Sequence, residues 1–172
     1  MVKIVLVGYM AVGKSTIGKI IAEKLQIDFV DLDENIEKTE NLSISEIFAK
    51  HGEIYFRKKE HLEFKKWIES PQSLVIATGG GTPCYANNHL LLKAANVVSF
   101  YLKASISELY KRLLMDSGNR PLVADKTEEE LREFIAKNLF DRSYFYHQAL
   151  NVVSVDGKMP EAVAEEILQK LH

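Results

Sequence analysis

The chain has 172 residues, a length that fits one domain and suffices to bury a sizeable core. Its 22 basic and 24 acidic side chains leave a formal charge of −2, whereas general nucleic-acid or membrane-surface binders carry a basic excess. The 47% share of hydrophobic and 27% share of charged residues is typical of globular proteins and excludes disorder as the main theme.

Short β-branched runs alternate with longer amphipathic stretches along the chain, a pattern typical of parallel strands joined by crossover helices. The expected strands are residues 3–7, 28–32, 73–77, 97–102 and 151–155. The expected helices are residues 14–25, 43–49, 53–67, 88–94, 105–115, 127–146 and 160–171. Ser43 followed by Glu46 is a capping-box pattern, and Pro160 suits the first turn of the last helix. The sequence therefore predicts an α/β fold.

The N-terminal strand leads into Gly8–Ser15, which matches the pattern G-x-x-x-x-G-K-[ST]. It also has the required context, since an apolar strand precedes it and an amphipathic helix follows. In such a P-loop, backbone N–H groups and the helix N-terminus face the phosphates of a nucleotide. Lys14 would reach the β- and γ-phosphates, and the Ser15 hydroxyl would ligate Mg²⁺. The D-x-x-G and N-K-x-D patterns of G-proteins do not occur, so a GTPase switch is not expected.

Asp31 and Asp33 come at the end of the expected second strand, where alternation puts both carboxylates on one side of the carboxyl edge. One could hold Mg²⁺ through water, while the other accepts a hydrogen bond from the hydroxyl that attacks phosphorus. A solvated strand end is the alternative.

Three consecutive glycines, Gly79–Gly81, follow the third expected strand. Glycine loses much backbone entropy on folding, so such a run is best explained by close approach of the backbone to another group. In a parallel sheet this loop opens on the same edge as the P-loop. A plain turn is the alternative.

Residues 116–126 are polar, contain Gly118 and Pro121, and show no clear periodicity. We expect a mobile loop there, because long loops in compact domains often act as lids or binding loops, although a structural linker is the alternative.

Arg57, Arg120 and Arg142 stand in distinctive local contexts, although a single arginine is usually solvated or salt-bridged. An anionic acceptor requires bidentate guanidinium groups, and phosphoryl transfer requires a cation at the γ-phosphate. These arginines are therefore candidates for both tasks.

Together these segments resemble the shikimate kinases over essentially the whole chain, in the order and spacing of that family. The matching segments are GYMAVGKST at 8–16, DLD at 31–33, SISEIFAKHGEIYFRKKE at 43–60, ATGGG at 77–81, NRPL at 119–122 and DRSYFY at 141–146. The resemblance implies a P-loop kinase three-layer sandwich in one domain over residues 1–172. Its five-stranded parallel sheet would have the order 2-3-1-4-5, with helices on both faces. A substrate-binding region would span about 33–60 and a mobile lid about 116–126.

The resemblance also implies a role for individual residues. ATP would be bound by Gly8, Ala11, Val12, Gly13, Lys14, Ser15, Thr16, Arg112, Arg120, Lys158 and Pro160. Shikimate would be bound by Asp33, Arg57, Gly79, Gly80 and Arg142, with the two arginines on its carboxylate. Lys14, Asp33 and Arg120 would be catalytic, and Mg²⁺ would be held by Ser15 and Asp31.

Three features depart from the common family pattern. Ala11 stands where many members have glycine, Thr82 and Pro83 follow the triple glycine, and Lys158 replaces a frequent arginine. Position 11 is one of the free positions of the P-loop pattern, so we expect Ala11 to be tolerated. The other two differences affect only peripheral contacts.

The expected activity is ATP-dependent phosphorylation of the shikimate 3-hydroxyl, a step of aromatic amino acid biosynthesis, with Mg²⁺ as cofactor. We expect a monomer whose partners are ATP and shikimate, with no nucleic acid and no membrane. The apolar run at residues 2–7 contains Lys3 and is too short for a signal peptide or a membrane span. Cys84 is the only cysteine, so a disulfide is not expected and the predicted location is the reducing cytoplasm.

Two alternatives are retained. Another small-metabolite kinase, such as a gluconate kinase, would also use a P-loop, and the arginines do not exclude every sugar acid. A catalytically silent nucleotide-binding module would have a broken acidic or lid motif, whereas Lys14, Ser15, Asp33 and Arg120 are all present.

Overall fold

A computed structural model of the chain describes residues 1–116 and 125–171. Within these ranges, five parallel strands form one sheet in the order β2-β3-β1-β4-β5. The strands are β1 (Lys3–Val7), β2 (Asp28–Asp31), β3 (Leu74–Ala77), β4 (Val97–Lys103) and β5 (Asn151–Ser154). The predicted α/β fold and its strand order are confirmed.

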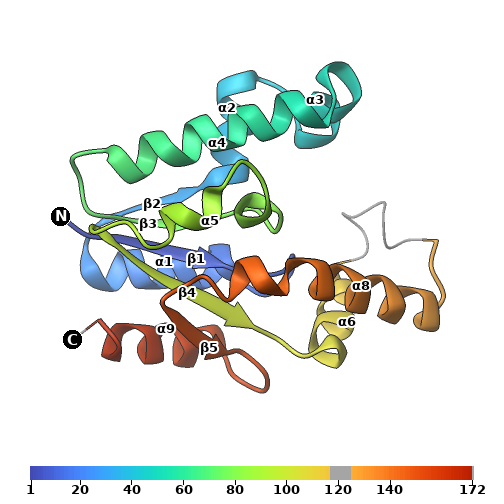
Figure 1. The fold of residues 1–172 in the computed structure, drawn as a ribbon. Helices are drawn as coiled ribbons and strands as arrows, with labels where there is room; N and C mark the ends of the chain where they lie inside the picture. The colour runs from blue at the N-terminus through green and yellow to red at the C-terminus, as the bar shows by residue number, and fades with distance from the viewer. Residues whose placement is uncertain (117–124, 172) are drawn as a thin grey trace.

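Helices cover both faces of the sheet (Figure 1). α1 and α9 contact each other on one face, whereas α4, α5 and α8 lie over the other. The helices in the described ranges are α1 (Lys14–Leu25), α2 (Leu32–Glu40), α3 (Ile44–His51), α4 (Glu53–Glu69), α5 (Asn88–Leu91), α6 (Ile106–Met115), α8 (Glu128–Tyr146) and α9 (Pro160–Gln169), with the short 3₁₀ helix η1 (Thr82–Cys84). This is the predicted three-layer arrangement.

The central strands are mostly apolar because helices cover both of their faces, with Lys3 in β1 and Ser99 in β4 as buried polar exceptions. Every residue of β1 and of β3 is buried, whereas β2 and β5 at the sheet edges are partly exposed. The loops that leave the carboxyl ends of β1 and β3 therefore start from fully buried strands at the centre of the sheet.

Local signals set several helix starts as expected. The Ser43 hydroxyl accepts a hydrogen bond from the Glu46 N–H, and the Glu46 carboxylate accepts one from the Ser43 N–H. Thr127 and Glu130 form the same capping box at the start of α8, and Pro160 is in the first turn of α9.

The segment after β2 differs from the prediction. β2 ends at Asp31 and α2 begins at Leu32, so Asp33 lies in a helix and the alternation of a strand does not apply to it. The Asp31 side chain causes this change by accepting a hydrogen bond from the Glu34 N–H at 3.1 Å, which caps the helix. Asp33 and Glu34 in the first turn further favour the helix through its dipole.

Two further predictions meet the structure only in part. α5 ends at Leu91, three residues earlier than expected, and the loop expected at residues 116–126 falls mainly on 117–124, outside the described residues. Arg120 and most of the predicted lid therefore lie there too. No described helix has both the length and the apolar character needed to cross a membrane.

Candidate active site

The P-loop joins β1 to α1 and lines a cavity of about 510 Å³. Gly8 has a φ of 148°, and a Cβ there would come 2.7 Å from the Leu102 carbonyl oxygen, so only glycine fits. Gly13, with a φ of 100°, is the N-cap of α1. The loop is thus shaped by glycines where the backbone requires them.

The backbone of Ala11 differs from the expectation that position 11 is a free position of the P-loop pattern. Its φ of 64° places it in the left-handed region, where a residue with a Cβ is strained by roughly 1–2 kcal/mol. Position 11 is therefore not conformationally free, although the Ala11 side chain itself lines the cavity.

Lys14 is buried and crosses the P-loop from the first turn of α1. Its Nζ donates to the carbonyl oxygens of Gly8 at 2.7 Å and Tyr9 at 2.9 Å. Arg112 reaches the same loop from α6, where its Nη1 donates to the Val12 carbonyl at 2.9 Å. Both cations line the cavity and contact the P-loop, so this part of the cavity suits an anionic ligand, whereas Asp31, Asp33, Glu34, Glu37 and Asp116 are also among the lining residues.

The Ser15 hydroxyl donates to Asp31 Oδ2 at the wall of the same cavity. This contact unites a hydroxyl and a carboxylate, which are the hard oxygen ligands that Mg²⁺ prefers. The described residues contain no group of three or more His, Cys, Asp or Glu side chains that could form a metal site. A magnesium ion here would thus take further ligands from phosphate and water, as it does in phosphoryl-transfer sites. The pair fits that role.

Asp33 faces this cavity from the first turn of α2, so Asp31 and Asp33 do share one site although the reason predicted for it was wrong. Burial raises the pKa of Asp33 to about 6, and the negative charges of Glu60 and Asp31 add to the increase, while Lys14 opposes it. A Cβ on Gly79 would lie 2.9 Å from Asp33 Oδ1. Glycine at position 79 therefore makes room for a carboxylate with an unusually high pKa.

The three glycines after β3, the triglycine loop (Gly79–Gly81), also separate the two predicted acceptor arginines. A Cβ on Gly81 would come 2.8 Å from Arg57 Nη2, and one on Gly80 would come 3.4 Å from Arg142 Nη1. Arg57 comes from α4 and Arg142 from α8, so the tertiary fold brings them to opposite parts of one short loop.

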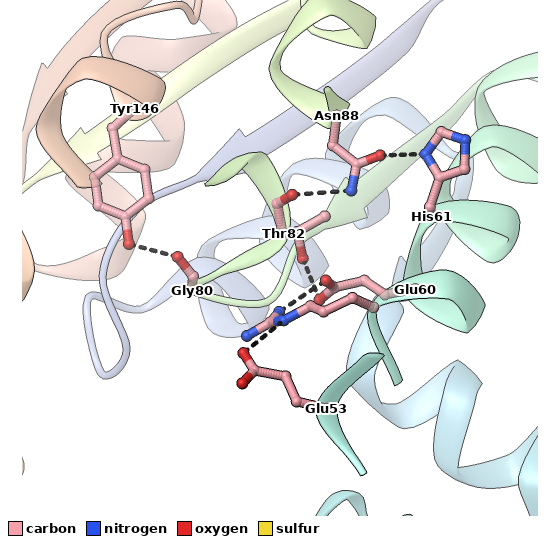
Figure 2. A network of polar contacts seen from close by, with 8 residues as sticks. Glu53, Glu60, His61, Gly80, Thr82, Asn88 and Tyr146 are labelled. Atoms are coloured by element: carbon pink, nitrogen blue, oxygen red, sulfur yellow. Dashed lines mark hydrogen bonds and ion pairs between the residues drawn. The ribbon is translucent and has the colours of Figure 1, made fainter. Parts of the chain in front are cut away.

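The Arg57 guanidinium has two contacts, an ion pair at its edge and an aromatic ring against its face. Its Nη1 donates to Glu60 Oε1 at 2.8 Å, and its guanidinium stacks on the Tyr85 ring at 3.9 Å from the centroid. Glu60 is only 1% exposed, so its buried charge depends on this pairing. Thr82 donates its hydroxyl to the other Glu60 oxygen at 2.8 Å (Figure 2).

The structure brings most of the sequence-predicted residues together. The cavity is lined by Ala11, Gly13, Lys14, Ser15, Thr16, Asp31, Asp33, Gly79, Gly80 and Arg112 among the predicted residues. Gly8 and Val12 support it from within the loop. Arg57 and Arg142 are not among the lining residues, and they lie against the triglycine loop instead. Lys158 and Pro160 are also absent from the lining. They lie at the start of α9, where Lys158 forms an ion pair with Glu166 at 2.6 Å.

Sequence reasoning assigned no role to several residues of this region. Glu34, Glu37 and Thr78 line the cavity, while Glu60, Thr82 and Tyr146 contact its surrounding groups. A local signal existed only for Glu60, which follows Arg57 by the three-residue spacing of helical ion pairs. The other contacts join distant parts of the chain.

Comparisons with known proteins agree with this geometry. The family model described as "Shikimate kinase" matches residues 10–172. A protein of Flavobacterium johnsoniae named shikimate kinase is 54% identical over 171 residues, covering 99% of each chain. The crystal structure of shikimate kinase from Bacteroides thetaiotaomicron has a TM-score of 0.90 at 33% identity and covers 99% of this chain and 98% of that one. The shikimate kinase from Acinetobacter baumannii in complex with shikimate has a TM-score of 0.85 at 30% identity, covering 99% of this chain and 93% of that one.

Proposed function

The chain belongs to the shikimate kinase family, and on that premise we propose that it transfers the γ-phosphoryl group of ATP to the 3-hydroxyl of shikimate. A bond forms between the hydroxyl oxygen and the γ-phosphorus, the bond from this phosphorus to the β–γ bridging oxygen breaks, and the hydroxyl proton leaves. The products are ADP and shikimate 3-phosphate. The observation that carries the proposal is that Lys14, Asp33 and the triglycine loop meet at one cavity.

The donor end of the site consists of the P-loop and its neighbours. Lys14 and the backbone N–H groups of the loop bind the phosphates of ATP and stabilise the charge that develops during transfer. Ser15, and Asp31 through water, hold Mg²⁺, which when bound with ATP neutralises charge on the phosphate oxygens. Arg112 binds near the adenine, supported by its position on the cavity wall.

The remaining donor contacts are proposed from the family resemblance. Arg120, which is outside the described residues, would act on the transferring phosphoryl group, and Lys158 and Pro160 would border the adenine. The predicted lid about residues 116–126 is proposed on the same basis.

Asp33 receives the acceptor hydroxyl. With a pKa of about 6 it is ionised at neutral pH, yet basic enough to accept or orient a proton better than an ordinary carboxylate. Arg57 and Arg142 bind the shikimate carboxylate from the two parts of the triglycine loop that they contact, and Gly79 and Gly80 add to the acceptor site. Residues of about 33–60, on α2 to α4, thus form much of the substrate-binding region. A cytoplasmic monomer is proposed from the sequence alone.

A coupled assay of ADP release tests the acceptor, with shikimate, gluconate and nucleoside monophosphates as the panel. With ATP as the donor, we expect ADP release with shikimate and with no other acceptor of the panel. Turnover of gluconate at a comparable rate would contradict the proposal in favour of another sugar-acid kinase.

Arg57→Lys and Arg142→Lys test how the acceptor is bound, because lysine keeps the charge and loses the bidentate geometry. Each variant should raise the KM for shikimate at least about tenfold and leave the KM for ATP nearly unchanged. Arg132→Lys on the same α8 helix is the control, since Arg132 pairs with Glu128 at 3.1 Å and is not among the side chains that lie against the triglycine loop. Equal effects on both substrates would indicate a structural role instead.

A further inference from the structure

One hydroxyl group bonds the triglycine loop, a second belongs to the residue that follows it, and each also contacts the environment of one acceptor arginine. The Tyr146 hydroxyl donates to the Gly80 carbonyl at 2.6 Å, and Thr82 lies directly after Gly81 (Figure 2). Resting on the proposed carboxylate-binding role of Arg57 and Arg142, we propose that Thr82 and Tyr146 are positioning residues that set the spacing of these two guanidinium groups.

On the Arg57 side, the contact runs through a buried carboxylate. Thr82 is fully buried and donates to Glu60 Oε2 at 2.8 Å, while Arg57 donates to Glu60 Oε1 at 2.8 Å. With one oxygen bound by each partner, the Glu60 carboxylate has a single orientation. Removing the Thr82 hydroxyl leaves a buried carboxylate oxygen without a donor, which frees Glu60 and the arginine that depends on it.

Thr82 is itself held by a chain of polar groups. Asn88 Nδ2 donates to the Thr82 carbonyl oxygen at 2.9 Å, and Asn88 Oδ1 lies 2.7 Å from His61 Nδ1 (Figure 2). Asn88 is fully buried at the start of α5, and His61 is on α4, one residue after Glu60. The network therefore closes a ring from α4 through η1 and α5 back to α4, which leaves Thr82 little freedom to move.

On the Arg142 side, a single residue, Tyr146, lies between the triglycine loop and the arginine. Tyr146 follows Arg142 by one turn of α8, so the two side chains lie on the same face of the helix, and their polar groups interact directly. Burial raises the pKa of Tyr146, so its hydroxyl stays protonated and able to donate to Gly80. Its ring packs against Tyr101 at 5.2 Å between centroids, which fixes the phenol in place. Tyr146 thus connects the triglycine loop to the position of Arg142.

The two contacts act on one loop from two helices, α4 and α8, that are distant in the sequence. The carboxylate of the acceptor must bind both guanidinium groups together, so their separation determines the affinity for that carboxylate. Gly80 also lines the nucleotide cavity, but the P-loop itself is held by other contacts, from Lys14 and Arg112. Loss of either hydroxyl should therefore affect binding of the acceptor carboxylate more than binding of the nucleotide.

Thr82→Val and Tyr146→Phe remove each hydroxyl with little change in shape. We expect each to raise the KM for shikimate about five- to twentyfold, with the KM for ATP within about twofold of wild type. Thr82→Ser keeps the donor and should stay within about twofold of wild type. Ser99→Ala removes a buried hydroxyl that bonds Leu92 and Leu150 instead, so it controls for lost stability.

Titration calorimetry with shikimate and with its methyl ester distinguishes a change in the position of the arginines from a general loss of structure in the site. Thr82→Val and Tyr146→Phe should weaken binding of shikimate but not, beyond about twofold, that of the ester, which lacks the charged carboxylate. Equal weakening for both ligands, or failure of Thr82→Ser to restore binding, would overturn the inference. If thermal melting shows that the Thr82→Val variant is not folded, the Tyr146→Phe variant alone decides the question.

The arginine variants distinguish this inference from the proposed function. If Arg57→Lys and Arg142→Lys leave the KM for shikimate unchanged, the proposed carboxylate site is wrong. If those variants raise it while Thr82→Val and Tyr146→Phe do not, the carboxylate site stands and only the positioning role fails.

Discussion

Replacing Asp33 by Asn removes the charge that, in the proposed mechanism, accepts or orients the proton of the acceptor hydroxyl, and it keeps nearly the same shape and hydrogen-bonding capacity. We expect kcat to fall by about 10² to 10⁴, the usual contribution of a general base, with the affinity for ATP close to normal. In the wild-type protein, kcat/KM should decrease below about pH 6 as Asp33 becomes protonated. This decrease should be absent from the residual activity of the variant.

The same substitution should stabilise the fold at alkaline pH. The pKa of Asp33 rises from 3.8 to about 6 in the native state, mainly through burial, so the native state holds this proton more tightly than the unfolded chain. The stability gained from the bound proton is complete below about pH 4 and is lost as the pH rises through about 6. Since Asn cannot ionise, Asp33→Asn keeps that stability, and the pKa difference sets its gain at up to about 3 kcal/mol at pH 8.

Thermal unfolding and steady-state kinetics between pH 4 and pH 8.5 provide the measurement. A gain of about 3 kcal/mol corresponds to a melting temperature roughly 6 to 12 °C higher for a chain of this size. The difference from wild type should narrow towards zero as the pH falls to about 4. Retention of most of the kcat, or a variant no more stable than wild type at pH 8, would refute this account of Asp33.

Two further substitutions test the surroundings of Asp33. Asp31→Asn keeps a good N-cap for α2 but loses the charge beside Ser15, so we expect half-maximal activity at a severalfold higher Mg²⁺ concentration, with partial recovery in excess metal. A magnesium titration of the activity checks this. Recovery of Asp33→Asn activity by magnesium would mean that the two carboxylates have the opposite roles. Gly79→Ala places a Cβ 2.9 Å from Asp33 Oδ1, so the Asp33 carboxylate must shift. We expect kcat to fall about tenfold or more, with a smaller change in the KM for ATP. An unchanged kcat would show that the position of Asp33 is not critical.

Local features were the part of the molecule that could be predicted from sequence. The apolar run of β1, the glycines of the P-loop and the capping box at Ser43 act over a few residues, and the structure confirms each of them. The strand order came from the family resemblance, because strand pairing joins residues far apart and periodicity does not specify it.

The start of α2 shows where local reasoning failed. Asp31 and Asp33 were assigned to one site by the alternation of a strand, whereas the chain turns into a helix at Leu32. Two carboxylates two residues apart fit either conformation. The choice was decided by the capping hydrogen bond of Asp31 and by the buried positions of Leu32 and Ile36.

The sequence alone predicted the kind of chemistry, because Lys14 and Ser15 belong to one short P-loop motif and Asp33 to a short acidic segment at the end of the next expected strand. Only the tertiary structure decided the strength and direction of that chemistry. The pKa of Asp33 depends on burial and on Glu60 from another helix, and the placement of Arg57 and Arg142 depends on Thr82 and Tyr146. Desolvation and charge act through space, so their effect is set by which distant residues the fold brings together and shields from water.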